Sequence, residues 1–462
     1  MKSYYFGKSP RAVATFVCHV VNGTEQRAKD LLEHELERSG FERRDRDLVT
    51  ELVYGVLRRR GTVDYVLAQF SRLPLRKLQP HILEIMRLAA YQLLFLDKVP
   101  ASAAVNEAVE AAKQVGSSGA AGFVNGCLRS LARAIVGKSN EPGGDPRRAI
   151  PVGAGAWCVL DCPVLPDPRR AAAAYLTAAH SHPAWLVRRW LARFGEVTAQ
   201  QLCEADNAHE GIVLRVNRLR TTQELLVAEL VRSGRWAKPL GTDHVVVDQA
   251  GLLANLAALT DGLCTVQGVA ASAAAPLLAP KAGELVLDMC SAPGSKACQL
   301  AELARGEAEV VALDISPRRL QLVAENVRRL GSRTVWAVAG DGFSCERLFA
   351  ARFDAALVDV PCSNTGVLAR RVESRWRLTA EKIGELSGVQ GRLLASAAEV
   401  VRPGGRLVYS TCSLEREENE GVIEGFCSAQ ADYRLAESRY ILPSETGDDG
   451  GYLALLQRAG RE

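Results

Sequence analysis

Two cysteines follow predicted strands at positions where they could take part in covalent chemistry. The segment 358–366 reads VDVPCSNTG and contains Asp359 and Cys362, while 409–413 reads YSTCS and contains Cys412. A lone free cysteine is usually a small buried hydrophobe. Two thiols and a carboxyl group at the carboxyl ends of neighbouring strands, where parallel sheets bind ligands, indicate a reaction centre instead.

A second candidate site is the turn that follows a predicted strand at 284–290. It reads DMCSAPGSK from Asp288 to Lys296, and the next predicted strand ends in Asp314. A turn of small residues lets the backbone approach a ligand at a helix N-terminus, and an acid ending the second strand suits a ribose diol. The chain lacks both G-x-G-x-x-G and G-x-x-x-x-G-K-[ST], so neither a dinucleotide site nor a phosphate-cradling loop is supported.

A positively charged ligand with ribose and adenine but no polyphosphate fits this turn, and S-adenosylmethionine has that character. Asp341, which ends the third predicted strand, is placed to accept a hydrogen bond from the adenine amino group. The predicted cofactor-binding residues are therefore Cys290, Ser291, Ala292, Pro293, Gly294, Ser295, Lys296, Asp314, Asp341 and Asp359.

A methyl donor beside two thiols suggests methylation of carbon 5 of cytosine. That carbon is a poor nucleophile until a group adds to carbon 6, and a cysteine thiolate of lowered pKa both adds and leaves readily. A carboxyl group of raised pKa that holds a proton against ring nitrogen 3 would stabilise the developing charge, and Asp359 is the candidate. Spacing alone does not decide whether Cys362 or Cys412 adds to the ring.

These motifs resemble those of the bacterial 16S rRNA cytosine-C5 methyltransferases of the RsmB (Sun) type. The turn at 288–296 is similar to the family's D-x-C-A-A-P-G-G-K, 359–363 to D-x-P-C-S, and 409–413 to Y-S-T-C-S. The resemblance implies that Cys412 is the nucleophile and that Cys362 assists release of the product. It also implies an RNA substrate, because DNA cytosine methyltransferases use the Pro-Cys thiol.

Three positions depart from the residues that this family usually has: Gly268, Ser272 and Ser295. None of them removes a reacting group. They bear on the affinity for the cofactor, which the sequence does not determine.

Length and periodicity predict the elements that carry these motifs. A chain of 462 residues suggests about three domains. Strand, turn and helix alternate after residue 283, which predicts an α/β fold with a mostly parallel sheet covered by helices. The resemblance implies that this is a Rossmann-like class I methyltransferase fold with seven strands. We divide the chain into a NusB-like helical RNA-binding domain (1–138), a Pro/Gly-rich linker (139–170), a small α+β connecting unit (171–262) and a methyltransferase domain (263–462).

The front of the chain is expected to hold RNA. Apolar residues at helical spacing predict helices over 24–38, 45–57, 80–96, 101–115 and 119–136. Segments 43–65, 99–115 and 123–128 resemble the RNA-binding domain of the antitermination factor NusB, which makes the arginines at 43, 44, 46 and 58–60 a predicted RNA face. Residues 1–236 hold 33 Lys and Arg against 24 Asp and Glu, and residues 237–462 hold 24 against 29, so the front half is basic.

The sequence also indicates where the protein works in the cell. No run reaches the roughly 18 apolar residues of a membrane span, and the N-terminus lacks a signal-peptide pattern, so we expect a cytoplasmic protein without a membrane segment. The twelve cysteines are expected to be thiols. We also expect a monomer that binds 16S rRNA and no metal.

Two alternatives stay open. One is the same chemistry on tRNA or another RNA. The other is a binding-only antitermination or assembly factor whose C-terminal domain no longer turns over.

Overall fold

The computed structural model describes residues 9–117, 119–153, 155–208, 211–248, 256–350 and 352–460. Parts of the expected helical domain (1–8) and of the expected connecting unit (209–210 and 249–255) lie outside this range. The chain divides into two compact units. The first comprises Met1–Ala208 and Ala369–Arg377, and the second His209–Leu368 and Leu378–Glu462.

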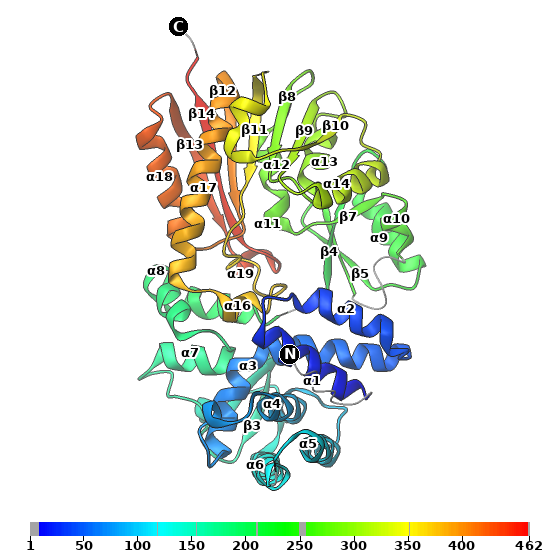
Figure 1. Ribbon diagram of the computed structural model, residues 1–462, viewed down its shortest axis with the longest axis vertical. Helices are drawn as coiled ribbons and strands as arrows, with labels where there is room; N and C mark the ends of the chain where they lie inside the picture. The colour runs from blue at the N-terminus through cyan, green and yellow to red at the C-terminus, as the bar shows by residue number, and fades with distance from the viewer. Residues whose placement is uncertain are drawn as a thin grey trace. The chain divides into compact units, whose positions relative to one another are not determined.

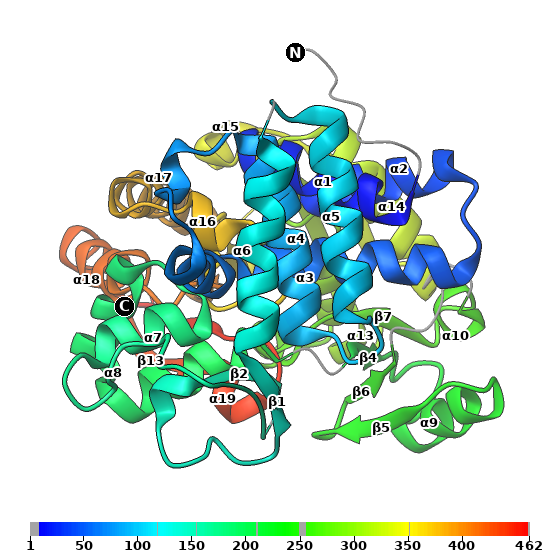
Figure 2. The ribbon, with the colours of Figure 1, turned by 90° about the horizontal axis from the view of Figure 1, so that it is seen from below.

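The first unit begins with a bundle of helices around one apolar core. They are α1 (Pro10–Gly23), α2 (Ala28–Ser39), α3 (Arg43–Phe70), α4 (Pro80–Phe95), α5 (Ala101–Val115) and α6 (Ala120–Ala134). Helices α2 to α6 confirm the predicted ones, although α3 extends well beyond 45–57. Figure 2 shows α5 and α6 running side by side across this unit. Helix α1 was not predicted, although Ser9 caps it by accepting from the backbone N–H of Ala12 and Pro10 starts it.

Residues 139–170 differ from the expected linker, because much of this segment is folded. Strands β1 (Ile135–Ser139), β2 (Ala149–Gly153) and β3 (Ala156–Leu160) form an antiparallel sheet in the order β1-β3-β2. Ile150, Cys158 and Leu160 are buried in the core of the helical bundle. Pro151 and Gly153 belong to β2 itself, and the other prolines and glycines of this segment lie outside its strands. Helices α7 (Ala172–His180) and α8 (Ala184–Ala205) follow.

The predicted RNA face at residues 58–60 is wrong. Arg59 is 6% exposed, its guanidinium lies 5.1 Å from the centre of the Phe95 ring, and it donates to a backbone carbonyl of β2. Arg58 and Arg60 are half-buried, and Arg60 donates to the side chain of Asn22. These arginines lie on the face of α3 that packs within the unit, where their polar groups bind backbone and side-chain oxygens.

Arg375 secures the part of the first unit that comes from late in the chain. It lies at the start of the short helix α16 (Ser374–Arg377) and is fully buried. Its guanidinium donates to the backbone carbonyls of Arg58 (3.1 Å), Ser181 (3.0 Å) and Asp206 (3.0 Å) and to the side chain of Asn207 (3.0 Å). Ordering of residues 369–377 within this unit is thus linked to α3, α7 and α8.

The second unit begins with a four-stranded antiparallel sheet in the order β5-β6-β4-β7. It comprises β4 (Ile212–Val216), β5 (Ala237–Leu240), β6 (His244–Val247) and β7 (Cys264–Val266), with α9 (Gln223–Arg232) and α10 (Ala257–Thr260). These strands and helices agree with the α+β composition expected for the connecting unit, although β7 extends past its expected end at residue 262. Arg215 of β4 forms a buried ion pair with Glu302, which fixes the sheet against a helix of the next layer.

The rest of the second unit is a seven-stranded sheet in the order β10-β9-β8-β11-β12-β14-β13. Strands β8 to β12 are parallel, whereas β13 and β14 are antiparallel, which confirms the predicted mostly parallel α/β fold. Their bounds are β8 Leu285–Met289, β9 Glu309–Asp314, β10 Val335–Ala339, β11 Phe353–Asp359, β12 Val401–Thr411, β13 Tyr433–Ile441 and β14 Gly451–Arg458.

Helices cover both faces of this sheet, as Figure 1 shows. Adjacent strand residues point to opposite faces, so Val286 packs toward one helical layer and Leu287 toward the other. The first layer contains α12 (Ala274–Leu278), α13 (Ser295–Leu303) and α14 (Pro317–Leu330), and the second contains α17 (Ala380–Val400) and α18 (Glu420–Ala429). The short helices α11 (Val269–Ser272), α15 (Cys345–Leu348) and α19 (Pro443–Thr446) complete the unit. Within the described residues, no helix combines the length and apolar composition needed to cross a bilayer.

We predict that Arg375→Met destabilises the first unit, because it leaves the carbonyls that Arg375 binds buried without a donor. The expected loss in the free energy of unfolding is about 3 kcal/mol. Urea denaturation followed by tryptophan fluorescence measures it. Lys113→Met, at an exposed ion pair of α5, is the control and should change the free energy by less than about 0.5 kcal/mol. Equal stability of Arg375→Met and wild type would contradict the anchoring role.

Candidate active site

The predicted cofactor turn joins β8 to α13 and folds back on itself. The backbone N–H of Ser291 donates to the carbonyl of Leu313 (2.9 Å), and that of Gly294 donates to the carbonyl of Ser291 (2.7 Å). Gly294 has φ of 91°, and a Cβ there would lie 2.9 Å from a methyl group of Val323 on α14. Glycine is therefore required where the turn passes close to α14 and begins α13.

Two of the predicted acids stand at strand ends beside this turn but differ in their surroundings. Asp314 is buried and accepts from the backbone N–H groups of Ala292 (3.2 Å) and Ser316 (3.0 Å). Asp341 is exposed and accepts from the backbone N–H of Phe343 (3.0 Å), so it caps a short 3-10 turn. Asp314 is thus bound to the cofactor turn, whereas Asp341 retains a solvent-facing carboxylate.

Asp288 gives the turn a buried acceptor that suits a cationic ligand. Its Oδ2 accepts from Ser291 Oγ at 2.6 Å, while its Oδ1 is buried and has no hydrogen-bond partner among the described residues. Burial raises the pKa of Asp288 to about 7. A buried carboxyl oxygen without a donor among the described residues, beside a turn of small residues that begins α13, fits the amine-bearing, positively charged S-adenosylmethionine.

The two predicted thiols meet at the carboxyl ends of β11 and β12. Cys362 Sγ and Cys412 Sγ lie 2.9 Å apart, although 50 residues separate them in sequence. Cys412 Sγ also donates to Asn364 Oδ1 (3.2 Å), and the amide of Asn364 donates to the carbonyl of Cys362 (2.9 Å). Asn364 was not among the predicted site residues. Its left-handed backbone, with φ of 64°, is a conformation that asparagine adopts more easily than most residues.

Asp359 and Lys296 connect the cofactor turn with the thiols. Lys296 is the second residue of α13, and its Nζ donates to Asp359 Oδ2 at 2.8 Å. Burial lowers the pKa of Lys296, but attraction to Asp359, Asp288 and Cys412 outweighs this and raises the pKa overall. The sequence analysis placed Lys296 in the cofactor turn and did not anticipate its ion pair with Asp359.

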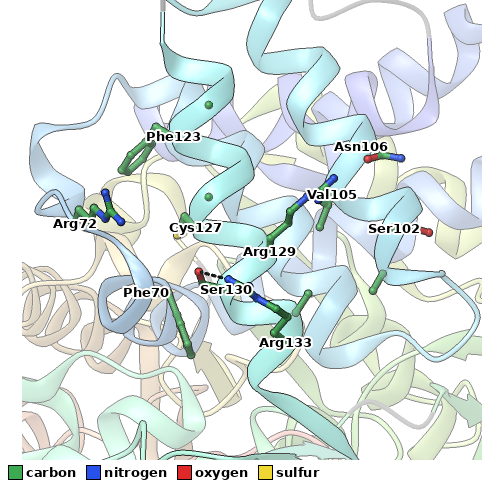
Figure 3. A pocket seen from close by; sticks show the side chains of 14 residues that line it. Phe70, Arg72, Ser102, Val105, Asn106, Phe123, Cys127, Arg129, Ser130 and Arg133 are labelled. Carbon is green, nitrogen blue, oxygen red and sulfur yellow. Dashed lines mark hydrogen bonds between the residues drawn. The ribbon is translucent and has the colours of Figure 1, made fainter.

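The first unit carries a separate groove of about 940 Å³ between α5, α6 and the end of α3 (Figure 3). Three exposed arginines line it, Arg72, Arg129 and Arg133. Two half-buried aromatic rings, Phe70 and Phe123, also line it. This groove presents positive charge beside aromatic surface, whereas Arg59 of α3 is buried and Arg58 and Arg60 are half-buried.

Comparisons with known proteins agree with this architecture. Residues 275–456 match the family "16S rRNA methyltransferase RsmB/F", residues 8–133 match the NusB family, and residues 182–251 match the ferredoxin-like domain of RsmF/B-like methyltransferases. The chain is 27% identical to a methyltransferase homologue from Pyrococcus horikoshii whose crystal structure covers 62% of this chain and 99% of its own, with a TM-score of 0.55.

Two curated relatives match along almost their whole length. The probable ribosomal RNA small subunit methyltransferase B of Bacillus subtilis is 32% identical over 93% of this chain and 94% of its own. The corresponding protein of Synechocystis is 32% identical over 98% of this chain and 100% of its own. Within the described residues no group of His, Cys, Asp or Glu side chains is arranged to hold a metal ion. The chain therefore belongs to the ribosomal RNA small subunit methyltransferase B family and is an S-adenosylmethionine-dependent RNA methyltransferase.

Proposed function

We propose that this enzyme methylates carbon 5 of a specific cytosine in 16S rRNA through a covalent adduct between Cys412 and carbon 6. The proposal rests on the pair of thiols, which lie 2.9 Å apart. They follow β11, which ends in Asp359, and β12, at the same edge of the sheet as the cofactor turn that follows β8. Redox chemistry also uses paired thiols, but neither redox nor hydrolytic chemistry needs a methyl-donor site beside them. Methylation of a pyrimidine carbon does need a thiolate that adds to the ring and then leaves.

The two thiols are suited to different tasks. A hydrogen bond with Cys412, burial and the charge of Glu418 raise the pKa of Cys362 well above its ordinary value. A thiol that keeps its proton is a poor nucleophile. Attraction to Cys412 contributes to the raised pKa of Lys296, which places a positive charge near that sulfur. Both observations favour Cys412 as the nucleophile and Cys362 as the group that assists release.

Each residue then has one task in the reaction. The Cys412 thiolate forms a bond to carbon 6, and Asp359 contacts ring nitrogen 3, so that carbon 5 becomes nucleophilic. S-adenosylmethionine supplies the methyl group that carbon 5 takes up. The carbon 5 proton then passes to water, and the bond between Cys412 and carbon 6 breaks with its electron pair returning to sulfur, which restores the ring and the thiolate. Cys362 would assist this release, and the cofactor would leave as S-adenosylhomocysteine.

The cofactor would be held by the turn from Cys290 to Lys296 together with the strand-end acids. Asp314 is suited to the ribose hydroxyls, and the exposed carboxylate of Asp341 to the adenine amino group. Asp288 Oδ1 provides a free acceptor in the same region. These assignments follow from the chemistry of the groups and their place at the strand ends.

RNA would also be held by the groove on the first unit. Arg72, Arg129 and Arg133 can bind phosphates, while Phe70 and Phe123 offer faces on which bases stack. The NusB-family match over residues 8–133 supports a nucleic-acid role for this unit. The same chemistry on tRNA or another RNA is the alternative, and methyl transfer to defined RNAs separates the two.

The first prediction from the proposed function concerns the nucleophile. Cys412→Ala should lower methyl transfer to an unmodified 16S rRNA transcript by at least about 1000-fold, because no other group adds to carbon 6. Transfer of a radiolabelled methyl group measures it. Cys427→Ala, which removes a half-buried thiol of α18, should retain wild-type activity. Activity of Cys412→Ala close to wild type would contradict the assignment.

The second prediction concerns product release. Cys362→Ala should accumulate a covalent protein–RNA adduct, because the adduct forms but resolves slowly. Denaturing gel electrophoresis after incubation with RNA and S-adenosylmethionine detects it. The double variant Cys362→Ala/Cys412→Ala should form none. An adduct with Cys412→Ala and none with Cys362→Ala would reverse the two roles.

The third prediction concerns the groove. The double variant Arg129→Glu/Arg133→Glu should weaken binding to 16S rRNA and reduce the slope of log affinity against log salt by about 0.7 for each phosphate that is no longer neutralised. Filter binding at several salt concentrations measures both. Lys113→Glu, an exposed change on α5 outside the groove, is the control. An unchanged slope in the double variant would remove the groove from the RNA-binding surface.

A further inference from the structure

A buried carboxylate lies beneath the two turns that carry the thiols. Glu418 is fully buried and accepts hydrogen bonds from both motifs. Its Oε1 accepts from the backbone N–H of Ser363 (2.8 Å), and its Oε2 accepts from the hydroxyls of Ser363 and Ser413. Ser363 directly follows Cys362, and Ser413 directly follows Cys412. One carboxylate therefore binds the residue next to each thiol.

The remaining acceptor position of Glu418 is also filled. Gln390 of α17 donates to Oε1 at 2.9 Å and to the carbonyl of Pro361 at 2.9 Å. The backbone carbonyl of Glu418 accepts from the hydroxyl of Tyr409. Four donors surround a group that has about four acceptor sites when ionised. Burial raises the pKa of Glu418, whereas the hydrogen bonds from Ser363, Ser413 and Gln390 oppose that shift.

Direct contacts also join the two turns, and one of them is the hydrogen bond from the backbone N–H of Leu414 to Thr365 Oγ1 (2.8 Å). The hydroxyls of Ser363 and Ser413 lie 3.1 Å apart, the hydroxyl of Thr365 lies 3.3 Å from Ser413 Oγ, and the backbone N–H of Gly366 donates to the carbonyl of Cys412 at 2.9 Å. Both serine hydroxyls donate to the same carboxylate oxygen. Their shared acceptor fixes the separation of the two turns, and with it the separation of the thiols.

We propose that Glu418 is a positioning residue that holds Cys362 and Cys412 at reactive spacing by binding Ser363 and Ser413 with a single carboxylate. The inference rests on the proposed function, since it assigns the spacing to a reaction that uses both thiols. Glu418 does not touch the substrate in this role. It acts through the backbone and hydroxyl groups of the residues beside the thiols.

Glu418→Gln tests this role because it keeps the shape of the side chain and replaces one acceptor oxygen by a donor. If the amide nitrogen takes the place of Oε2, both serine hydroxyls lose their shared acceptor. If it takes the place of Oε1, it faces the donors of Ser363 N–H and Gln390 and repels them. We expect kcat for methylation of a 16S rRNA transcript to fall by about 100-fold, the loss that a misplacement of about 1 Å can cause. The KM for S-adenosylmethionine should stay within about twofold of wild type, because Glu418 contacts none of the predicted cofactor residues.

A second measurement separates positioning from general damage. In the Cys362→Ala background, Glu418→Gln should slow the formation of the covalent adduct in a single turnover by a similar factor. Glu284→Gln is the matched control, because it removes a half-buried carboxylate paired with Arg406 at the opposite ends of the strands. It should leave kcat within about twofold even if it lowers stability.

The outcomes separate this inference from the proposed function. If wild-type protein methylates no cytosine of the transcript, the proposed function fails. If wild type is active and Glu418→Gln keeps its kcat and its rate of adduct formation, the positioning role alone is overturned. If Glu418→Gln no longer binds S-adenosylmethionine by calorimetry and is therefore misfolded, the double variant Ser363→Ala/Ser413→Ala decides. A comparable loss of kcat with retained cofactor binding supports the role, and wild-type kcat overturns it.

Discussion

The chemistry of this protein depends on the parallel pairing of β11 with β12. Asp359 stands opposite Ser410 in that pairing, and the backbone N–H of Val360 still donates to the carbonyl of Ser410 one residue further on. The chains then turn away just where their cysteines occur. The pairing of the two strands thereby brings thiols that are 50 residues apart in sequence to within 2.9 Å of each other. A change in register would move one thiol along the edge of the sheet and turn alternate side chains to the opposite face.

Charged groups of both signs lie near the two thiols. The positively charged Lys296 lies near Asp288, Asp359 and Cys412. Attraction to these groups raises the pKa of Lys296, although burial acts to lower it. Asp288, in contrast, has its pKa raised to about 7 by burial and keeps one oxygen without a donor. A positively charged cofactor placed here would favour the charged form of that carboxyl group. Asp288 is therefore available to a positively charged methyl donor, and the ammonium group of Lys296 lies near Cys412, the proposed nucleophile.

The sequence was informative where local patterns determine structure. Runs of apolar residues ending in Asp288, Asp314 and Asp359 predicted strands, and the small residues around Gly294 predicted a tight turn, because these features depend on neighbours in the chain. It was misleading at residues 58–60, since the packing of α3 buries an arginine run whose composition resembles an exposed basic patch. It also left 139–170 as a linker, because short strands between prolines show no sustained period. Glu418 could not be found at all: four acidic residues stand at 415–420, and only the fold shows which of them binds both turns.

We propose that this chain forms 5-methylcytidine in small-subunit rRNA. Bisulfite sequencing of total RNA from a strain that lacks the protein, compared with its parent, tests it most directly because it reports both the modification and its position. We predict that a single cytosine of 16S rRNA loses protection in the deletion strain and regains it when the wild-type protein is restored. Unchanged protection of every 16S rRNA cytosine would contradict the claim, and loss of protection in a tRNA instead would transfer the same chemistry to another substrate.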